Sequence, residues 1–204
     1  MEQFENVIFD LGGVIINLDE QLTVNAFAKR SDLTAEEIKG KILQFETYKD
    51  FEKGKISESD LRDAIRHEFK VKGSDDEVDQ CFNAMLLDIP VQKLDLLTSL
   101  KSTHRIFLLS NTNSIHFKRF NEIIKETADV DRIDGYFHRA YYSHLMGMRK
   151  PDVEIFEAVL SDNDLDPSRT LFIDDNRTNL DGATKVGIQT HHLTQPDLLF
   201  QLFV

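Results

Sequence analysis

Near the start of the chain an apolar run leads into one carboxylate and two glycines, in the order Asn6-Val7-Ile8-Phe9-Asp10-Leu11-Gly12-Gly13-Val14. A short continuous apolar run of this kind predicts a strand that is buried on both faces. The glycines predict a tight turn directly after it. In α/β proteins, ligands bind beyond the carboxyl ends of such strands. We therefore expect Asp10 to serve as a nucleophile or a metal ligand for a small anion.

Two further apolar runs, residues 105–109 and 170–173, also end in polar residues. The first is followed by Ser110-Asn111-Thr112-Asn113 and the second by Asp174-Asp175-Asn176-Arg177. Weaker strand candidates are residues 136–141 and 188–193, and helical periodicity covers residues 91–100, 115–127, 153–160 and 179–186. This alternation predicts an α/β fold with a doubly wound parallel sheet. We expect the polar strand ends to form one site.

A long segment after the first strand interrupts the alternation, because it carries helical periodicity and no convincing strand. The helices expected there are residues 22–29, 35–45, 60–69 and 76–86. Thr34 and Ser57, each followed three residues later by an acid, are typical helix N-caps. We therefore predict a core domain of residues 1–17 and 88–204, with residues 18–87 inserted as a small helical-bundle cap.

The composition is acidic, with 24 Lys and Arg against 36 Asp and Glu and a net charge of −12. Such a charge repels nucleic acid and anionic membranes. No apolar run approaches the roughly 18 residues of a membrane helix, and no secretory signal precedes the first strand. We expect a cytoplasmic protein without a nucleic-acid or membrane partner. Its single cysteine, Cys81, lies in an apolar run and is expected to be a packed thiol.

Positive charge is needed wherever this acidic chain binds an anion, and one loop supplies it: Gly147-Met148-Arg149-Lys150-Pro151-Asp152. Pro151 suits the first position of the helix expected at residues 153–160 and would fix the lysine before it. Asp174 and Asp175 repel each other at the end of a buried strand and require a cation, either Lys150, a divalent metal or both. Ordinary alternatives are a solvated loop lysine and an Asp pair that caps a helix.

Taken together, the ordered Asp, Ser, Lys and Asp-Asp segments resemble the four motifs of the haloacid dehalogenase superfamily of aspartate-dependent hydrolases. The resemblance extends from Phe9 to about Gly187, and the motifs correspond to residues 9–14, 108–112, 150–151 and 172–176. The helical insert after the first motif is similar to the cap of the family's first cap class (C1, subfamily I). The motifs look especially like bacterial sugar-phosphate phosphatases of the α-D-glucose-1-phosphate phosphatase type.

This resemblance implies a nucleophile and a metal site. Asp10 would attack phosphorus in line and form an aspartyl phosphate that water later hydrolyses. Mg²⁺ would be held by the Asp10 carboxylate, the backbone carbonyl of Gly12 and Asp175. Asp174 would support the metal shell or the lysine.

The resemblance also implies a phosphate cradle and a partner. Ser110, the Asn111 backbone and Lys150 would bind the transferring phosphate oxygens, where positive charge meets the charge of the transition state. The partner would be a small-molecule phosphate ester, such as the sugar phosphate glucose 1-phosphate. The chain would act as a monomer or a homodimer, and an apolar segment at residues 196–204 is expected to dock on the core or to form a dimer contact.

Gly12 departs from the family pattern, because most family phosphatases carry a second Asp there that protonates the leaving alcohol and then activates water. Such an acid/base is worth about 10²–10⁴-fold in rate. A better leaving group, a proton from another residue or the substrate, or weak activity would each account for glycine. Asp19 and Glu20 are possible substitutes, although a solvated linker is the simpler interpretation.

Two alternatives to catalysis by a phosphatase remain open. A phosphate-binding protein of the same fold could have lost turnover together with the second Asp. A 2-haloacid dehalogenase would also use Asp10 as nucleophile, but it needs neither a metal nor a proton. The pair Asp174-Asp175 therefore favours phosphate.

Overall fold

A five-stranded parallel sheet forms the centre of the computed structural model, which describes residues 4–203. The strand order is β3-β2-β1-β4-β5, and the strands are β1 (Asn6–Phe9), β2 (Arg105–Ser110), β3 (Arg139–Tyr142), β4 (Thr170–Asp174) and β5 (Gln189–His192). Every neighbouring pair is parallel. The predicted doubly wound sheet is confirmed. The strand expected at residues 136–141 begins later, because Ile133–Tyr136 forms a 3₁₀ turn, η1.

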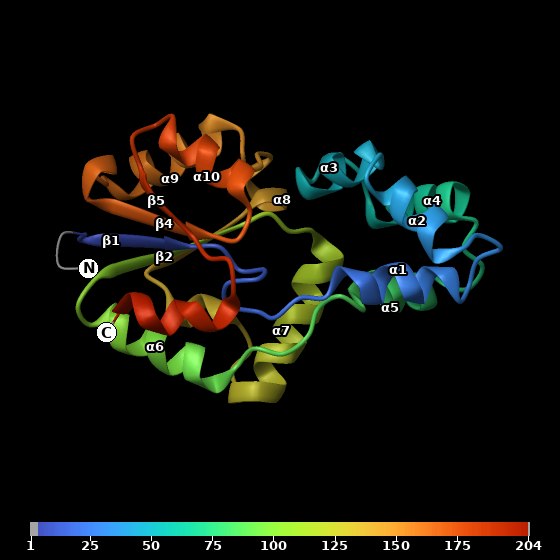
Figure 1. The fold of residues 1–204 in the computed structure, drawn as a ribbon, viewed down its shortest axis with the longest axis horizontal. Coiled ribbons are helices and arrows are strands. Elements are labelled where there is room, and N and C mark those ends of the chain that lie inside the picture. The colour runs from blue at the N-terminus through green and yellow to red at the C-terminus, as the bar shows by residue number, and fades with distance from the viewer. Residues whose placement is uncertain (1–3, 204) are drawn as a thin grey trace.

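Helices cover both faces of the sheet (Figure 1). One face carries α6 (Val91–Lys101), α7 (Ser114–Ala128) and the 3₁₀ helix η3 (Pro196–Phe203), and the other carries α9 (Val153–Asn163) and α10 (Arg177–Thr184). The short elements α8 (Ser143–Met146) and η2 (Pro167–Arg169) lie in the connections. Side chains of β1 alternate between the two apolar clusters, with Val7 and Phe9 in one and Ile8 in the other.

The apolar segment at the end of the described chain packs on the first of these clusters. Leu199 is buried there, and the ring of Phe203 lies 6.1 Å from that of Phe9. The prediction that this segment docks on the core is confirmed as far as residue 203, and Val204 lies outside the described residues.

Five helices between β1 and α6 form a bundle with an apolar cluster of its own. They are α1 (Glu20–Ala28), α2 (Ala35–Ile42), α3 (Glu46–Glu52), α4 (Glu58–Phe69) and α5 (Asp75–Asn83). Thr34 and Ser57 form the predicted caps, each as a full capping box. The expected helix at residues 35–45 ends at Ile42, and α3 follows as a separate helix that the sequence did not predict.

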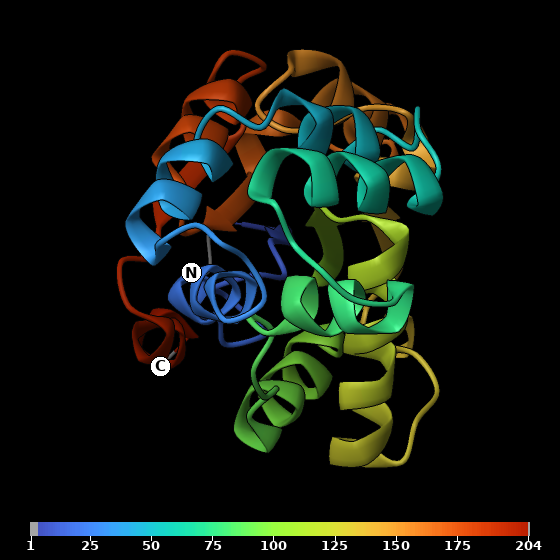
Figure 2. The same ribbon diagram turned by 90° about the vertical axis from the view of Figure 1, so that its right-hand side faces the viewer.

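The bundle stands over the carboxyl ends of the strands (Figures 1 and 2). Its two connections to the sheet run side by side, since the Leu87 amide donates to the Asn17 carbonyl at 3.0 Å and the Asn17 amide donates to the Asp88 carbonyl at 2.9 Å. Within residues 4–203, no helix has the length and apolar character needed to cross a membrane.

Candidate active site

Three strand ends converge at the carboxyl edge of the sheet and place Asp10, Ser110 and Asp174 together. The register pairs Phe9 of the central strand with Leu108 on one side and with Ile173 on the other. The Asp10 amide continues the ladder with a 2.9 Å bond to the Ile173 carbonyl. Ser110 lies 100 positions and Asp174 164 positions after Asp10 in the chain. The register brings all three to the same point, as the strand pattern predicted.

Lys150 lies at the centre of this point and is fully buried, with 0% of its surface exposed. Its Nζ donates to Oδ1 of Asp10 at 2.7 Å, to Oδ2 of Asp174 at 2.8 Å and to the carbonyl of Leu109 at 2.9 Å. An ammonium has three hydrogens, and these three acceptors use all of them. A phosphate oxygen would have to take the place of one acceptor to bond Nζ directly.

Asn111, the residue directly after β2, holds the backbone of Lys150 in place. Its side-chain oxygen accepts from the Lys150 amide at 2.8 Å, and its side-chain nitrogen donates to the Lys150 carbonyl at 2.9 Å. The expected role of Pro151 as the first residue of a helix is wrong, because α9 begins at Val153 with Asp152 as its N-cap. The lysine is therefore positioned by the Asn111 amide rather than by a helix start.

Burial sets the proton affinities in this cluster. It raises the pKa of Asp10 to about 7, with the Lys150 charge acting in the opposite direction and the Asp174 charge adding to the rise. Burial opposes the charge on Lys150, but the carboxylates of Asp10 and Asp174 more than offset it and raise its pKa. We conclude that the lysine stays protonated and that a further cation beside Asp10 would favour the ionised form of this carboxyl group.

Asp10, Asp174 and Asp175 offer carboxylate oxygens that lie within 4.8 Å of one another. Asp174 is fully buried and accepts from Lys150, from the Asn176 amide at 2.7 Å and from the Asn179 side chain at 3.0 Å. Asp175 is exposed at the mouth of the site, and partial desolvation together with the Asp174 charge raises its pKa. Clustered carboxylate oxygens fit a hard divalent cation such as Mg²⁺.

A side chain would meet different neighbours at the two glycines of the first motif. Gly13 has φ +68°, and a Cβ there would lie 2.2 Å from Oδ2 of Asp175, so a side chain would displace that carboxylate. A Cβ on Gly12 would meet only Cδ1 of Leu18, at 2.8 Å. The position at which the resemblance leads us to expect a second Asp is therefore bordered by an apolar side chain.

A cavity of about 400 Å³ joins these groups to the helical bundle, and it is lined by residues of both parts, including Ser110, Glu20, Tyr48, Glu52, His116 and Arg149. Ser110 is 2% exposed, and its hydroxyl makes only a 3.5 Å contact with the Asn111 carbonyl. Of the two acids considered as substitutes for a second Asp, Glu20 lines this cavity. Asp19 caps α1 by accepting from the Gln21 amide at 3.0 Å.

A buried ion pair across the cavity escaped prediction from the sequence. Glu52, at the end of α3, is 3% exposed and accepts from Nε and Nη2 of Arg149 at 2.9 and 2.8 Å. Burial raises the pKa of Glu52, with Arg149 opposing the rise. Arg149 could have been suspected from its place beside Lys150, but Glu52 sits on a helix too short to show a clear periodicity.

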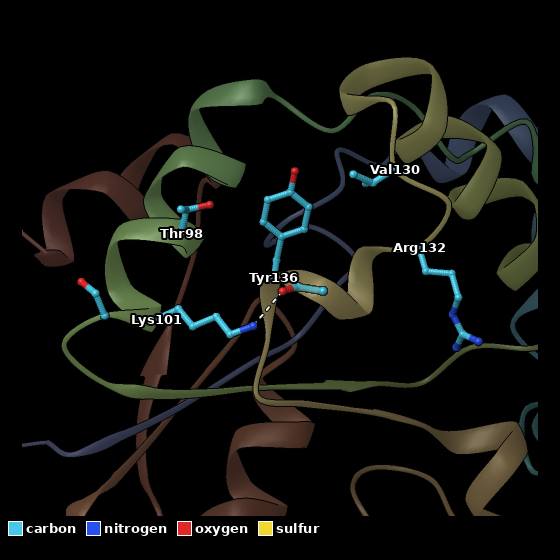
Figure 3. A pocket seen from close by; sticks show the side chains of 7 residues that line it. Thr98, Lys101, Val130, Arg132 and Tyr136 are labelled. Carbon is cyan, nitrogen blue, oxygen red and sulfur yellow. Dashed lines mark hydrogen bonds between the residues drawn. The ribbon is translucent and has the colours of Figure 1, made fainter.

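Another hollow, of about 500 Å³, lies between α6 and the η1 segment, away from the strand ends (Figure 3). Its two cations already have partners, because Lys101 donates to the Gly135 carbonyl at 2.7 Å and Arg132 donates twice to Asp134. Among its described lining residues there is no carboxylate or nucleophile cluster. We therefore assign the functional site to the strand ends.

Comparison with known proteins is consistent with this arrangement. A family model described as haloacid dehalogenase-like hydrolase matches residues 4–187. The chain is 28% identical over 186 residues to a D-ribitol-5-phosphate phosphatase of Bacteroides thetaiotaomicron, with 91% of this chain and 90% of that protein covered. It is 31% identical over 192 residues to the sesquiterpene phosphatase astK of Aspergillus oryzae, with 94% and 90% covered.

One solved structure combines the same fold with ligands. The crystal structure of the haloacid dehalogenase family enzyme bt-2542 from Bacteroides thetaiotaomicron, in complex with magnesium and inorganic phosphate, is similar with a TM-score of 0.85 and 36% identity. The similarity covers 98% of this chain and 100% of that chain.

Proposed function

The chain belongs to the haloacid dehalogenase-like hydrolases, and from this premise we propose that it is a Mg²⁺-dependent phosphatase that hydrolyses a small phosphate monoester through an aspartyl phosphate on Asp10. The observation that carries the proposal is the convergence of Asp10, Lys150 and the Asp174-Asp175 pair at one point. The resemblance inferred from the four motifs is confirmed for the family.

Asp10 has one oxygen positioned and one available for attack. Oδ1 accepts from Lys150, which leaves Oδ2 as the atom that attacks phosphorus. A bond forms between Oδ2 and phosphorus while the ester bond breaks, and the departing alkoxide takes a proton from water. A second water then attacks the phosphorus, the bond between Oδ2 and phosphorus breaks, and the carboxylate is regenerated. The water oxygen leaves in the inorganic phosphate, and a proton of that water neutralises the hydroxide left by the first step.

The surrounding groups stabilise the charge of the transferring phosphoryl group. We assign the metal to the Asp10 carboxylate, the Gly12 carbonyl and Asp175, where Mg²⁺ would supply positive charge to the phosphate oxygens. Asp174 supports Lys150, and the charge of the buried lysine opposes the rise in the Asp10 pKa and so favours the ionised form that attacks. Ser110 and the Asn111 backbone complete the phosphate cradle.

The alcohol part of the substrate is the finer part of the proposal. Glucose 1-phosphate is one candidate, because its anomeric oxygen is a better leaving group than an ordinary alcohol oxygen. It therefore depends less on a general acid, which Gly12 cannot supply. Ribitol 5-phosphate, which the bacterial relative's name carries, is another. The names of the two relatives described above contain a polyol phosphate and a sesquiterpene, which differ strongly in polarity, so both polar and apolar esters belong in a substrate panel.

Residues 18–87 act in this proposal as a cap over a core of residues 1–17 and 88–204. The bundle lies over the strand ends and contributes Tyr48 and Glu52 to the active-site cavity. Such a cap would limit access of water to the aspartyl phosphate. We place the enzyme in the cytoplasm, where a buried free thiol such as Cys81 stays reduced.

The test is release of inorganic phosphate from a panel of sugar, polyol and alkyl phosphates and p-nitrophenyl phosphate, with Mg²⁺ and with excess EDTA. We expect Mg²⁺-dependent release that Asp10→Asn abolishes while the circular dichroism spectrum is unchanged. Asp76→Asn, an exposed acid-to-amide change on α5, is the matched control and should keep full activity. No release from any ester, combined with tight binding of inorganic phosphate, would favour the non-catalytic alternative.

A further inference from the structure

A second cavity, of about 480 Å³, lies within the helical bundle beside the active-site cavity. Its walls are mainly apolar and aromatic, and they include Val24, Phe27, Ile42, Phe45, Phe69 and Phe82. Volumes of about 300–1,000 Å³ are typical of small-molecule pockets. The space is therefore large enough for an organic group rather than for a few waters.

The two cavities adjoin each other, because Leu18, Glu20, Tyr48 and Met85 line both. Leu18 is the link to the chemistry, since its Cδ1 is the atom that a side chain on Gly12 would meet at 2.8 Å. The border between the cavities therefore lies next to Gly12, two residues after the nucleophile. A group bonded to the leaving oxygen could extend along Leu18 and Met85 into the bundle.

Polar groups in the inner wall already have partners. The Thr23 hydroxyl donates to the Phe82 carbonyl at 3.0 Å and accepts from the Met85 amide at 3.1 Å. The charged lining residues Asp19, Glu20 and Lys39 are exposed. A sugar placed deep in this cavity would leave hydroxyls without hydrogen bonds, at a cost in binding, whereas a hydrocarbon would not.

One exposed residue marks the outer part of the cavity as apolar too. Leu43, which follows α2, is 80% exposed and still belongs to the lining. An apolar residue that is this exposed gains stability only when another apolar group covers it.

We propose that this cavity binds the apolar alcohol part of a phosphate monoester, and that the enzyme hydrolyses phosphate esters of medium-length or branched hydrocarbon alcohols in addition to polar ones. The inference rests on the phosphatase activity proposed above and names a substrate class for the same nucleophile. The phosphate would lie at Asp10, the ester oxygen beside Gly12 and Leu18, and the hydrocarbon between α1, α2 and α4.

The first experiment measures binding, so that it does not depend on turnover. Butyl, octyl and dodecyl phosphate are titrated into Asp10→Asn protein with Mg²⁺ by calorimetry, below their micelle concentrations. We expect the dissociation constant to fall about three- to fourfold for each methylene added until the cavity is filled. A dissociation constant that does not change with chain length overturns the proposal.

Two variants and one control locate the effect. Val24→Phe fills the cavity from α1 and should remove most of the chain-length dependence. Leu43→Asp changes an exposed residue that the fold does not need, and it should weaken dodecyl phosphate at least tenfold relative to butyl phosphate. The control Leu22→Phe lies on α1 outside this lining. It should change neither the chain-length dependence nor the affinity for dodecyl phosphate relative to butyl phosphate.

The outcomes separate this inference from the proposed function. Hydrolysis of p-nitrophenyl phosphate without any gain for long alkyl chains would overturn the apolar site and keep the phosphatase. Chain-length-dependent binding without hydrolysis of any ester would keep the apolar site and overturn the phosphatase. Equal chain-length dependence in wild type and in both cavity variants would place the hydrocarbon elsewhere and overturn the assignment.

Discussion

At the scale of single residues, the adjacent glycines 12 and 13 show how much a motif leaves open. Both were predicted to form a turn after the nucleophile. The structure shows that Gly13 makes room for Asp175, whereas Gly12 faces the movable end of Leu18. A side chain could therefore be added at position 12 with only a shift of Leu18, so this contact does not make glycine a requirement of the fold.

Gly12→Asp should accelerate hydrolysis of esters whose alcohol is a poor leaving group, because the new carboxylate could protonate the departing oxygen. The gain should approach about 10²-fold, the lower end of typical acid/base catalysis. Initial rates for butyl phosphate and p-nitrophenyl phosphate give the measurement, and only the butyl ester should respond, since nitrophenolate leaves without a proton. Gly12→Asn supplies a side chain of similar size without an acid and is the control. Equal rates for wild type and Gly12→Asp on butyl phosphate would mean that another group already donates the proton.

His116 is a buried base that the sequence did not single out. Its ring stacks on Phe82 with centroids 4.2 Å apart, and Nε2 lies 3.3 Å from the Phe82 carbonyl. Burial lowers its pKa from 6.5 to about 4. Between these values the unfolded chain binds a proton that the folded protein does not bind, so stability falls as pH drops from about 6.5 to 4.

We expect this residue to account for a loss of up to about 3 kcal/mol in the free energy of unfolding over that range. Urea unfolding of wild type and His116→Gln at a series of pH values measures it. Because all other groups titrate in both proteins, the difference between the two curves isolates His116. That difference should change with pH only below about 6.5, and a constant difference would show that folding does not shift the pKa of His116.

At the scale of elements, apolar periodicity predicted the strands and helices that bury a regular apolar pattern, and it missed a short helix. The three buried strands and the capped helices of the bundle were found because their apolar spacing and their Thr34 and Ser57 caps are local signals. Helix α3 has only seven residues, its N-cap Phe45 makes no side-chain hydrogen bond, and the sequence did not predict it. The same helix carries Glu52, so the missed element and the missed site residue have one cause. The contact between Glu52 and Arg149 spans 97 positions, and no local pattern predicts it.

Breaking the pair of Glu52 and Arg149 should loosen the bundle from the sheet. Arg149→Met should cost about 3–5 kcal/mol in the free energy of unfolding, because it leaves the buried Glu52 carboxylate without its arginine partner. Glu52→Gln should cost less, since the Arg149 side chain is 20% exposed, and the double variant should cost less than the sum of the two. Hydrogen exchange of α3 amides should rise in each single variant. Lys53→Met removes a more exposed pair with Asp152 next to the same helix and should cost at most about 1 kcal/mol. Additive losses in the double variant would mean that the two side chains are not coupled.

At the scale of the whole molecule, two bodies with separate apolar clusters share one site between them. The sheet supplies the acids and the lysine, and the bundle supplies the cavity that the alcohol part would enter. The core half of the site could be predicted because strand ends mark it in the sequence. The bundle half could not, since its lining comes from five helices and their connections and follows no motif. The net charge of −12 repels an anionic substrate from the protein as a whole, so positive charge at the site must offset this repulsion.

Magnesium should therefore act on the stability of the entire chain, since it would bind the acidic cluster only in the folded state. At a hundredfold excess over its dissociation constant it should add about 2.7 kcal/mol, which raises Tm by about 5–10 °C for a chain of this size. Differential scanning fluorimetry over a Mg²⁺ series, reversed by EDTA, measures the shift. Asp175→Asn should abolish the gain. Without metal it should raise Tm slightly, because the raised pKa of Asp175 means that its charge destabilises the fold at neutral pH. Asp181→Asn, an exposed acid on α10, should keep the full magnesium gain, and a Tm of wild type that does not respond to Mg²⁺ would remove the metal from the acidic cluster.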